Sequence, residues 1–411
     1  MSEHLRGACI IGQSGGPSSV LNATAYGMIS AALASPDITN VYGASHGIKG
    51  VLDEILFDMA EESPSELKYL PYTPSSELGT CRYKLADPYE DTEMFDRLLD
   101  VFKKHDVRYF FYNGGNDSMD TCEKISRYMD MVGYECRVVG VPKTIDNDLF
   151  GTDHCPGYGS AAKYIATSIA EVWKDACVYD TGTVVVLEIM GRHAGWLTAA
   201  SSLATLTGCG PDLIYLPETD FCLDQFLNDI ARVRADRGSA IIAVSEGIHY
   251  SDGTFVSEAV ASATDGFGHA QFGGLSARLA ALIKEQLGIK VRNIEYNLLQ
   301  RCASHCASKT DIEEGIMVGR DAVMRAVSGE TGIMVGLQRA PSAEYNCITA
   351  PVPLAAAANC ERLIPTDWIN RDGNGLNEKF YDYALPLIAG EPDRPTEDGL
   401  PRFARLVKKR I

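Results

Sequence analysis

Short apolar runs alternate with segments of helical periodicity along most of this chain, and this alternation restricts the fold more than any other feature. Such an order predicts repeated β-α-β units, and therefore mostly parallel sheets with helices on both faces. The runs that we interpret as strands occupy residues 8–12, 107–115, 136–142, 183–191, 239–247 and 291–299. The expected fold class is α/β with mostly parallel sheets.

The chain is long enough for two lobes, since its 411 residues exceed the length of one typical domain. Residues 151–182 contain mainly one amphipathic helix, which we expect to carry the chain from one lobe to the second. Beyond about residue 310 the periodic signals weaken. The last forty residues mix proline, aspartate and arginine, and we interpret them as an irregular surface extension.

Charge and composition exclude several classes of protein. A net charge of −18 argues against nucleic acid and anionic membranes as partners. No run of 18 or more uncharged apolar residues is present, and the first residues lack the basic start and apolar core of a signal peptide. We therefore expect a soluble, cytoplasmic protein with no membrane partner.

Twelve cysteines are scattered along the chain without regular spacing, which favours reduced, mostly buried thiols over disulfides. Cys302, His305 and Cys306 loosely resemble a metal-ligand cluster, but the second ligand pair of a zinc site is missing. Helix packing is the favoured explanation for these three residues, and the metal site remains the alternative.

Ligands bind open α/β sheets at the carboxyl ends of the strands, so the residues after each strand are candidate site residues. Residues 14–17, SGGP, follow the first strand and lead into a helix, where glycines and free N–H groups suit a phosphate. Residues 114–118, GGNDS, occupy the same place after the second strand. Simple turn geometry also explains the first cluster, and helix capping by Asp117 or Ser118 also explains the second.

The third strand ends in PKTIDND, residues 142–148, which combines a basic and an acidic side chain. Asp146 could accept a proton from a substrate hydroxyl, while Lys143 supplies positive charge to a transferring phosphoryl group. A solvated turn rich in aspartate and asparagine is the alternative explanation of this loop.

Charged residues also mark the later strands. Arg192 after the fourth strand suits a phosphate, and Glu246 after the fifth suits sugar hydroxyls. Arg292 and Arg301 stand at opposite ends of the sixth strand, so they serve one site only if one of them reaches across a subunit interface. Taken together, the strand ends favour a phosphoryl-transfer enzyme that acts on a small phosphorylated polyol.

The motifs GGNDS, PKTIDNDL, MGR, SEG and QR, in this order and spacing over residues 8–305, resemble those of the phosphofructokinase family. The resemblance implies two Rossmann-like lobes and phosphorylation of the 1-hydroxyl of fructose 6-phosphate. It places a donor-binding lobe at residues 1–157 plus about 300–350, and a sugar-phosphate-binding lobe at 158–299. Residues from about 351 to 411 would form a C-terminal extension packed on the lobes.

The resemblance also implies roles for individual residues. Asp146 would be the base, assisted by Lys143 and Asp117. The sugar phosphate would be bound by Thr144, Ile145, Met190, Gly191, Arg192, Glu246, Arg292 and Arg301. The donor would meet Gly15, Arg82, Gly115 and Ser118, and Mg²⁺ would lie near Asn116 and Asp148. Arg292 matches an arginine that the neighbouring subunit contributes, which implies a homo-oligomer that is at least a dimer.

Two positions indicate the phosphoryl donor. ATP-using members of the family carry glycine where Asp117 and Lys143 stand, whereas members that resemble this sequence use inorganic pyrophosphate. A carboxylate at Asp117 would repel the α-phosphate of ATP, and Lys143 would restore positive charge near the shorter donor. We therefore expect a reversible, pyrophosphate-dependent enzyme.

Three departures from the family pattern leave the identity of the sugar substrate undecided. Asn116 replaces a metal-associated aspartate, Thr183 replaces a second arginine of the partner subunit, and Leu298 replaces a histidine or tyrosine. A different sugar phosphate, such as sedoheptulose 7-phosphate, would be compatible with these changes. An ATP-dependent kinase and a non-catalytic, sugar-phosphate-binding regulatory subunit remain alternatives. A Rossmann dehydrogenase is disfavoured, because the first glycine turn is not G-x-G-x-x-G.

Overall fold

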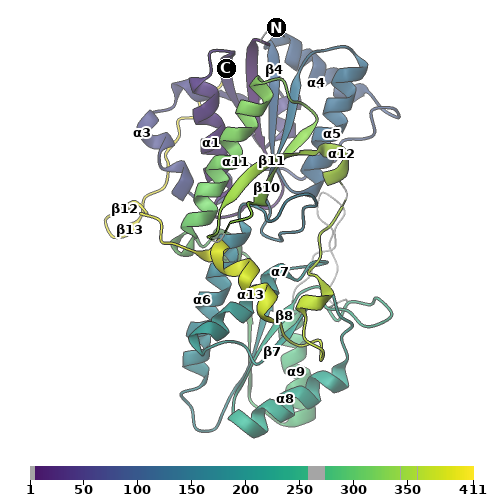
Figure 1. The fold of residues 1–411 in the computed structure, drawn as a ribbon, viewed down its shortest axis with the longest axis vertical. Coiled ribbons are helices and arrows are strands. Elements are labelled where there is room, and N and C mark those ends of the chain that lie inside the picture. Colours follow the sequence, from purple (N-terminus) through teal and green to yellow (C-terminus); the bar gives the residue numbers. More distant parts are fainter. Residues whose placement is uncertain (1–4, 258–273, 343, 359) are drawn as a thin grey trace.

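The computed structural model describes residues 5–257, 274–342, 344–358 and 360–411. The described chain forms two main sheets, which lie toward opposite ends of the molecule, each with helices packed on it (Figure 1). The helices alternate with strands, and most neighbouring strands run parallel. This architecture confirms the α/β fold class.

The sheet of the first lobe has seven strands in the order β11-β10-β5-β4-β1-β2-β3. The five inner strands pair parallel with one another, whereas the edge strands β3 and β11 pair antiparallel with β2 and β10. The strands are β1 Gly7–Gln13, β2 Ile38–Ala44, β3 Leu56–Asp58, β4 Val107–Gly114, β5 Arg137–Pro142, β10 Ile333–Arg339 and β11 Cys347–Pro353.

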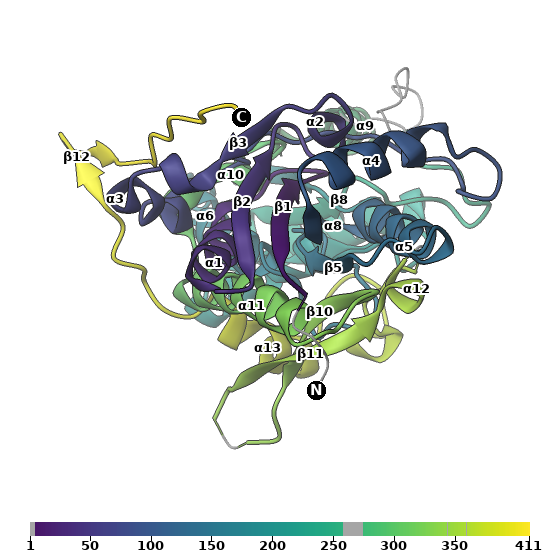
Figure 2. The same cartoon turned by 90° about the horizontal axis from the view of Figure 1, so that it is seen from above.

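Helices cover both faces of this sheet (Figure 2). Alternate residues of β1 point to opposite faces, because successive side chains of a strand do so. Ala8 and Ile10 join the core beneath α4 and α5, whereas Cys9 and Ile11 join the core beneath α1 and α11. The helices of this lobe are α1 Leu21–Ala34, α2 Ile48–Leu52, α3 Pro64–Leu67, α4 Glu93–Lys104, α5 Asn116–Met131, α11 Lys309–Val327 and α12 Leu354–Ala357.

Regular structure continues beyond about residue 310, where the periodic signals in the sequence weaken, and α11, β10 and β11 all belong to the first lobe. Glycines obscure the apolar pattern of α11 because they serve close helix packing. A Cβ atom at Gly319 would lie 2.1 Å from the carbonyl oxygen of Thr24 in α1, and one at Gly27 would lie 2.3 Å from that of Ile316 in α11. Strand β2 and the short strands β3 and β7 were not predicted either.

The second lobe contains a fully parallel sheet in the order β7-β8-β6-β9. Helix α6, Tyr158–Ala176, follows β5 of the first sheet and precedes β6 of the second, as expected of the connecting helix. The strands are β6 Val184–Ile189, β7 Leu213–Tyr215, β8 Ala240–Ser245 and β9 Val291–Glu295, and the other helices are α7 Trp196–Ala200, α8 Leu223–Arg237, α9 Leu275–Leu287 and α10 Leu299–Cys302.

The C-terminal segment is largely irregular, as expected, but it is not confined to the surface. Helix α13, Glu378–Ala384, lies between the two sheets (Figure 1), and its Phe380 is fully buried in the core of the second lobe. The chain then passes a hairpin, β12 Thr396–Glu397 and β13 Leu400–Pro401, and returns to the first lobe. There the amide nitrogen of Ile411 donates a hydrogen bond to the carbonyl oxygen of Leu56 in β3.

None of the helices in the described part of the chain is long and apolar enough to cross a membrane. All twelve cysteines are free in the described structure. Five of them are buried, so the expectation of mostly buried thiols holds only in part.

Candidate active site

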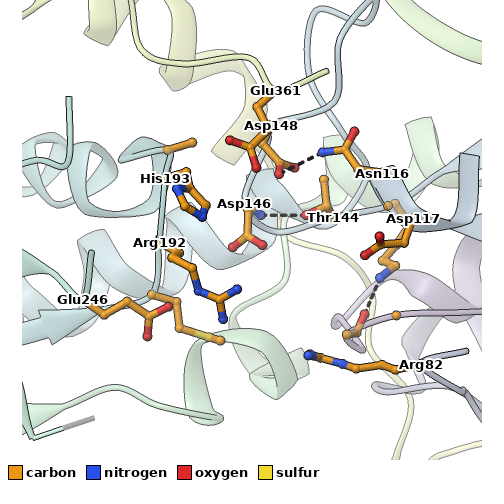
Figure 3. Close-up of a pocket in the computed structure, with 16 residues that line it drawn as sticks. Arg82, Asn116, Asp117, Thr144, Asp146, Asp148, Arg192, His193, Glu246 and Glu361 are labelled. Carbon is orange, nitrogen blue, oxygen red and sulfur yellow. Dashed lines mark hydrogen bonds between the residues drawn. The ribbon is translucent and has the colours of Figure 1, made fainter. Parts of the chain in front are cut away.

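A cavity of about 550 Å³ lies between the two lobes, where the carboxyl ends of strands from both sheets face each other. It is polar, since most of its side chains are charged (Figure 3). Its lining residues are Gly15, Gly16, Arg82, Gly115, Asn116, Asp117, Lys143, Thr144, Asp146, Asp148, Met190, Arg192, His193, Ala194, Glu246 and Glu361. Twelve of these are among the residues that the sequence predicted.

Two glycine turns of the first lobe form one side of the cavity. Gly15 follows β1 and has a φ of +76°, a left-handed conformation that glycine adopts without steric cost. Gly115 follows β4 and directly precedes α5, so Asn116 and Asp117 stand in the first turn of that helix. Ser118 is buried beneath this turn and does not line the cavity. The first turn of a helix favours an anion, yet here it carries a carboxylate of its own.

The loop after β5 is tied to both glycine turns. The amide nitrogen of Lys143 donates a 2.9 Å hydrogen bond to the carbonyl oxygen of Gly114. Its Nζ atom donates to the carbonyl oxygen of Gly16, and the side chain is only 3% exposed. Burial lowers the pKa of Lys143 to about 8, although the neighbouring Asp146 opposes this shift. The lysine therefore presents a positive charge that few water molecules solvate.

The loop Thr144–Asp148 begins directly after this lysine, and we call it the catalytic loop because the sequence predicts the base, Asp146, within it. Thr144 Oγ1 accepts a 3.0 Å hydrogen bond from the amide nitrogen of Asp146. Burial raises the pKa of Asp146, while Lys143 and Arg192 oppose the rise. Burial and the charge of Asp146 raise the pKa of Asp148 to about 7. A carboxylate with a raised pKa is a stronger base, which suits proton abstraction.

The second lobe supplies the opposite wall from the loops after β6 and β8. The amide nitrogen of Glu246 donates a 2.9 Å hydrogen bond to the carbonyl oxygen of Ile189, which joins the two loops. Gly247 permits this approach, because a Cβ atom there would lie 1.8 Å from the carbonyl oxygen of Arg192. Burial and the charge of Asp146 raise the pKa of Glu246 to about 7. Arg192 and Glu246 thus face the same cavity as the catalytic loop.

Positive charge surrounds Asp146. Lys143, Arg192, Arg301 and Arg82 all act on its pKa in the direction that favours the carboxylate. Arg301, in α10, does not line the cavity but is adjacent to it, since a Cβ atom at Gly16 would lie 3.5 Å from its Nη1 atom. Four cationic side chains therefore act on this one carboxylate, although the net charge of the whole chain is −18.

Three of the predicted substrate residues lie outside the cavity lining besides Arg301. Ile145 is buried in the core of the second lobe, and Gly191 is buried although its sequence neighbours Met190 and Arg192 line the cavity. Arg292 stands in β9 at the other end of the strand from Arg301, where it is half-exposed and forms a 3.4 Å ion pair with Asp175. The structure thus keeps the two arginines apart within one chain.

Four lining residues received no individual role from the sequence: Gly16, His193, Ala194 and Glu361. The first three flank predicted residues, so the same motifs could have indicated them. Glu361 comes from the C-terminal segment, where it pairs with Leu149 in an antiparallel bridge next to the catalytic loop. No strand or helix pattern in that segment indicates such a contact.

The cavity contains oxygen ligands that suit a hard divalent cation. Asn116 Oδ1 is buried and has no hydrogen-bond partner among the described residues, while its Nδ2 donates a 3.2 Å hydrogen bond to Asp148 Oδ2. Asp146, Asp148 and Glu361 add carboxylates around this amide (Figure 3). Mg²⁺ prefers such oxygen donors, so the donor set fits the ion.

The other candidate metal groups have simpler explanations. Cys302 is exposed at the end of α10, and the group that it forms with His305 and Cys306 does not satisfy the geometry of a metal site in the described structure. His154, Glu314 and Cys347 do lie close enough together to hold an ion. Both nitrogens of His154 are instead occupied by carboxylates, Asp153 at 2.8 Å and Glu314 at 2.7 Å.

Comparison with known proteins gives the same family that the sequence motifs resemble, and it does so over most of the chain. A family model described as phosphofructokinase matches residues 8–322. The chain is 44% identical over 403 residues to a pyrophosphate–fructose 6-phosphate 1-phosphotransferase of Halomonas elongata, with 97% of this chain and 96% of the relative covered. A protein of the same name from Xanthomonas campestris is 44% identical over 407 residues, with 97% and 96% covered.

A solved structure supports the likeness in three dimensions. The crystal structure of a pyrophosphate-dependent phosphofructokinase from Marinobacter aquaeolei superposes with a TM-score of 0.89 at 39% sequence identity. The alignment covers 99% of this chain and 97% of that one. It therefore includes the C-terminal segment as well as both lobes.

Proposed function

The chain belongs to the phosphofructokinase family, and we infer from this premise that it is a pyrophosphate-dependent 6-phosphofructokinase. It transfers a phosphoryl group from pyrophosphate to the 1-hydroxyl of fructose 6-phosphate, giving fructose 1,6-bisphosphate and phosphate. The observation that carries this inference is the presence of Asp117 and Lys143 in one cavity with Asp146. We also propose that the enzyme works in the cytoplasm, where phosphorylated sugars are made and consumed.

We propose that Asp117 selects the donor. It stands in the first turn of α5, next to the glycine turn that would receive the donor phosphates. A third phosphate and its nucleoside would extend toward this carboxylate, and like charges at short distance in a poorly solvated cavity repel strongly. Pyrophosphate is shorter and avoids this repulsion, and Lys143 supplies positive charge to it.

We propose that Asp146 is the general base. Its carboxylate takes the proton of the 1-hydroxyl as that oxygen attacks the nearer phosphorus of pyrophosphate. The new P–O bond forms, the bond from this phosphorus to the bridging oxygen breaks, and inorganic phosphate leaves with the bonding electrons. Lys143 and Arg82 stabilise the negative charge on the transferred and leaving groups. In the reverse direction Asp146 returns the proton to the sugar.

We propose that the second lobe binds the sugar phosphate. Thr144, Met190, Arg192 and Glu246 face the cavity and would contact the sugar, with Arg301 on the 6-phosphate. Ile145 and Gly191 would act through their backbone groups, since the Ile145 side chain is buried in the core and Gly191 has no side chain. Gly15, Gly115 and the buried Ser118 would position the donor from the first lobe. This division assigns donor binding to residues 1–157 plus about 300–350, and sugar binding to residues 158–299.

We propose that Mg²⁺ assists the reaction, held by Asp148, the Asn116 amide oxygen and Glu361. When bound, the ion would neutralise charge on pyrophosphate and orient it for transfer. The unpartnered Asn116 oxygen supports this assignment. A neutral amide stands here where the family has an aspartate, and Glu361 from the segment beyond about residue 351 restores the negative charge.

We propose that the working protein is a homo-oligomer, at least a dimer. Arg292 lies far from the cavity of its own chain, at the other end of β9, and would enter the sugar-phosphate site of a neighbouring subunit. Thr183, which precedes β6, would leave that site with one partner arginine fewer than many relatives have.

Initial rates with fructose 6-phosphate and Mg²⁺ test the proposal, with pyrophosphate and ATP compared as donors. Turnover with pyrophosphate alone supports it, and turnover with ATP alone would contradict the donor assignment while leaving Asp146 as base. Activity only with sedoheptulose 7-phosphate would change the sugar. Binding of fructose 6-phosphate without turnover by either donor would favour a regulatory subunit.

A further inference from the structure

Asn147, at the centre of the catalytic loop, adopts an uncommon backbone conformation. Its φ is +58°, in the left-handed region that few residues other than glycine, asparagine and aspartate occupy. Its side chain is fully buried and points away from the cavity, whereas its neighbours Asp146 and Asp148 face the cavity. Such a conformation persists only where surrounding contacts hold it, so the partners of Asn147 determine where the two aspartates point.

Two hydrogen bonds hold the side chain of Asn147. Its Oδ1 atom accepts a 2.9 Å bond from the amide nitrogen of Cys155. Its Nδ2 atom donates a 2.8 Å bond to Tyr383 Oη, which in turn donates a 2.8 Å bond to the carbonyl oxygen of Asp153. The tyrosine hydroxyl therefore donates its single proton to the carbonyl oxygen of Asp153 and accepts the hydrogen bond from Asn147. It thereby links Asn147, inside the loop, to Asp153, beyond the end of the loop.

Aromatic packing fixes the ring of Tyr383. It lies on α13 and is only 6% exposed. Its centroid is 5.2 Å from that of Trp196 and 5.4 Å from that of Trp368, and the Arg339 guanidinium carbon is 4.6 Å from it. A ring held on several sides leaves the hydroxyl little freedom to move away from Asn147.

The C-terminal segment, which contains Tyr383, contacts the catalytic loop at a second point. The amide nitrogen of Arg362 donates a 2.7 Å hydrogen bond to the carbonyl oxygen of Asp148. Its guanidinium donates to Tyr383 Oη at 3.3 Å and stacks 4.3 Å from the Trp196 ring centroid. Residues far beyond the matched range of 8–322 thus hold the loop from its buried side.

We propose that Tyr383 is a positioning residue, which holds Asn147 in its left-handed conformation and thereby aims Asp146 and Asp148 into the cavity. The C-terminal segment is then a structural part of the active centre. This inference rests on the proposed function for its kinetic consequences, but the state of the loop can be measured without any turnover.

The test substitutes Tyr383→Phe, which keeps the ring and removes only the hydroxyl. We expect kcat with pyrophosphate and fructose 6-phosphate to fall by about 10- to 100-fold, because small displacements of catalytic groups have effects of that order. KM for fructose 6-phosphate should stay within about threefold, since the sugar contacts of the second lobe remain in place. Tyr381→Phe is the matched control, because Tyr381 lies on the same helix and packs on the same core.

A double-mutant cycle separates positioning from general destabilisation. If Tyr383 acts through Asn147, Tyr383→Phe should lower kcat little further in an Asn147→Gly background, since glycine keeps the positive φ but cannot bond the hydroxyl. Multiplicative losses in the double variant would overturn the proposal. Asn147→Gly alone carries the kinetic test if Tyr383→Phe does not fold, and a kcat within twofold of wild type would then overturn it.

Hydrogen–deuterium exchange of peptides covering residues 144–150 gives the readout that needs no substrate. Exchange should be faster in Tyr383→Phe and unchanged in Tyr381→Phe. If the wild-type protein shows no turnover with pyrophosphate, the proposed function fails while this measurement still tests the loop. Unchanged exchange, or faster exchange with wild-type kcat, would overturn the positioning role.

Discussion

The backbone of Lys143 is bonded to that of Gly114, with 2.9 Å between the amide nitrogen of the first and the carbonyl oxygen of the second. This bond joins the loop after β5 to the glycine turn that leads into Asp117. The two residues that we assign to donor choice therefore belong to one connected unit, although 25 positions of sequence separate them. A change at either one should alter how the donor sits at the other.

Lys143→Met should lower kcat with pyrophosphate by about 100- to 1,000-fold, the loss typical of removing one preorganised charge from a transition state. The lysine is 3% exposed, so water cannot replace its charge well. Steady-state kinetics would measure the effect, with Lys103→Met as control because Lys103 is exposed on α4. Near-normal turnover of Lys143→Met would remove the lysine from the mechanism.

The double variant Asp117→Gly, Lys143→Gly should shift donor preference toward ATP. Removing the carboxylate relieves its repulsion of a third phosphate, and removing the lysine opens space above Gly16. The ratio of kcat/KM for ATP to that for pyrophosphate should rise by at least about 100-fold. An unchanged ratio, with both activities lowered equally, would show that other groups choose the donor.

Gly319→Val should destabilise the first lobe without touching the cavity. A Cβ atom at this position would lie 2.1 Å from the carbonyl oxygen of Thr24, and backbone cannot move aside as a flexible side chain can. Forcing α1 and α11 apart should cost about 3 kcal/mol. The apparent thermal midpoint should fall by several degrees, whereas Arg320→Ala, at an exposed position of the same helix, should leave it near wild type.

Much of the fold was predictable because the buried parallel strands are continuous apolar runs. Strands β1, β4, β5, β6 and β8 are almost wholly buried, and each was recognised from its sequence. Helix α11 was not, since the glycines that fit it against α1 dilute its apolar stripe. Strand β3 has only three residues, too few to show a period.

The site was predictable where its residues follow strands. Asp146, Arg192 and Glu246 stand directly beyond β5, β6 and β8, so topology alone brings them to one edge. Glu361 and Tyr383 reach the same centre through an irregular segment. Their contacts with the catalytic loop are long-range in sequence, and no local pattern encodes such contacts.

The buried pair His154 and Glu314 should make stability depend on pH. Burial alone would disfavour the charged imidazole, but hydrogen bonds with Asp153 and Glu314 prevail and raise the pKa of His154 to about 9. Because this pKa is above the unfolded value of about 6.5, the stabilisation is complete below pH 6.5 and is lost as pH rises through about 9. It should amount to about 3 kcal/mol.

Thermal denaturation between pH 6 and pH 10 would measure this dependence. Between pH 6 and pH 10 the thermal midpoint of the wild-type protein should fall by more degrees than that of His154→Gln, because glutamine cannot carry the charge. Tyr345, Cys347 and Arg339 also face this cluster, so the comparison between the two proteins, rather than the wild-type curve alone, isolates the histidine. Parallel curves would show that His154 does not supply the stabilisation.

Glu361→Gln should weaken binding of a divalent cation. Its carboxylate lies in the cavity with Asp148 and the Asn116 amide, and affinity for hard cations follows the number of charged oxygen ligands. We expect the dissociation constant for Mn²⁺, used as a paramagnetic probe in place of Mg²⁺, to rise about tenfold. Glu378→Gln is the control, since Glu378 is exposed at the start of α13. A dissociation constant equal to that of wild type would leave the metal with Asp148 and Asn116 alone, whereas recovery of affinity in Glu361→Asp would confirm that a carboxylate is needed at this position.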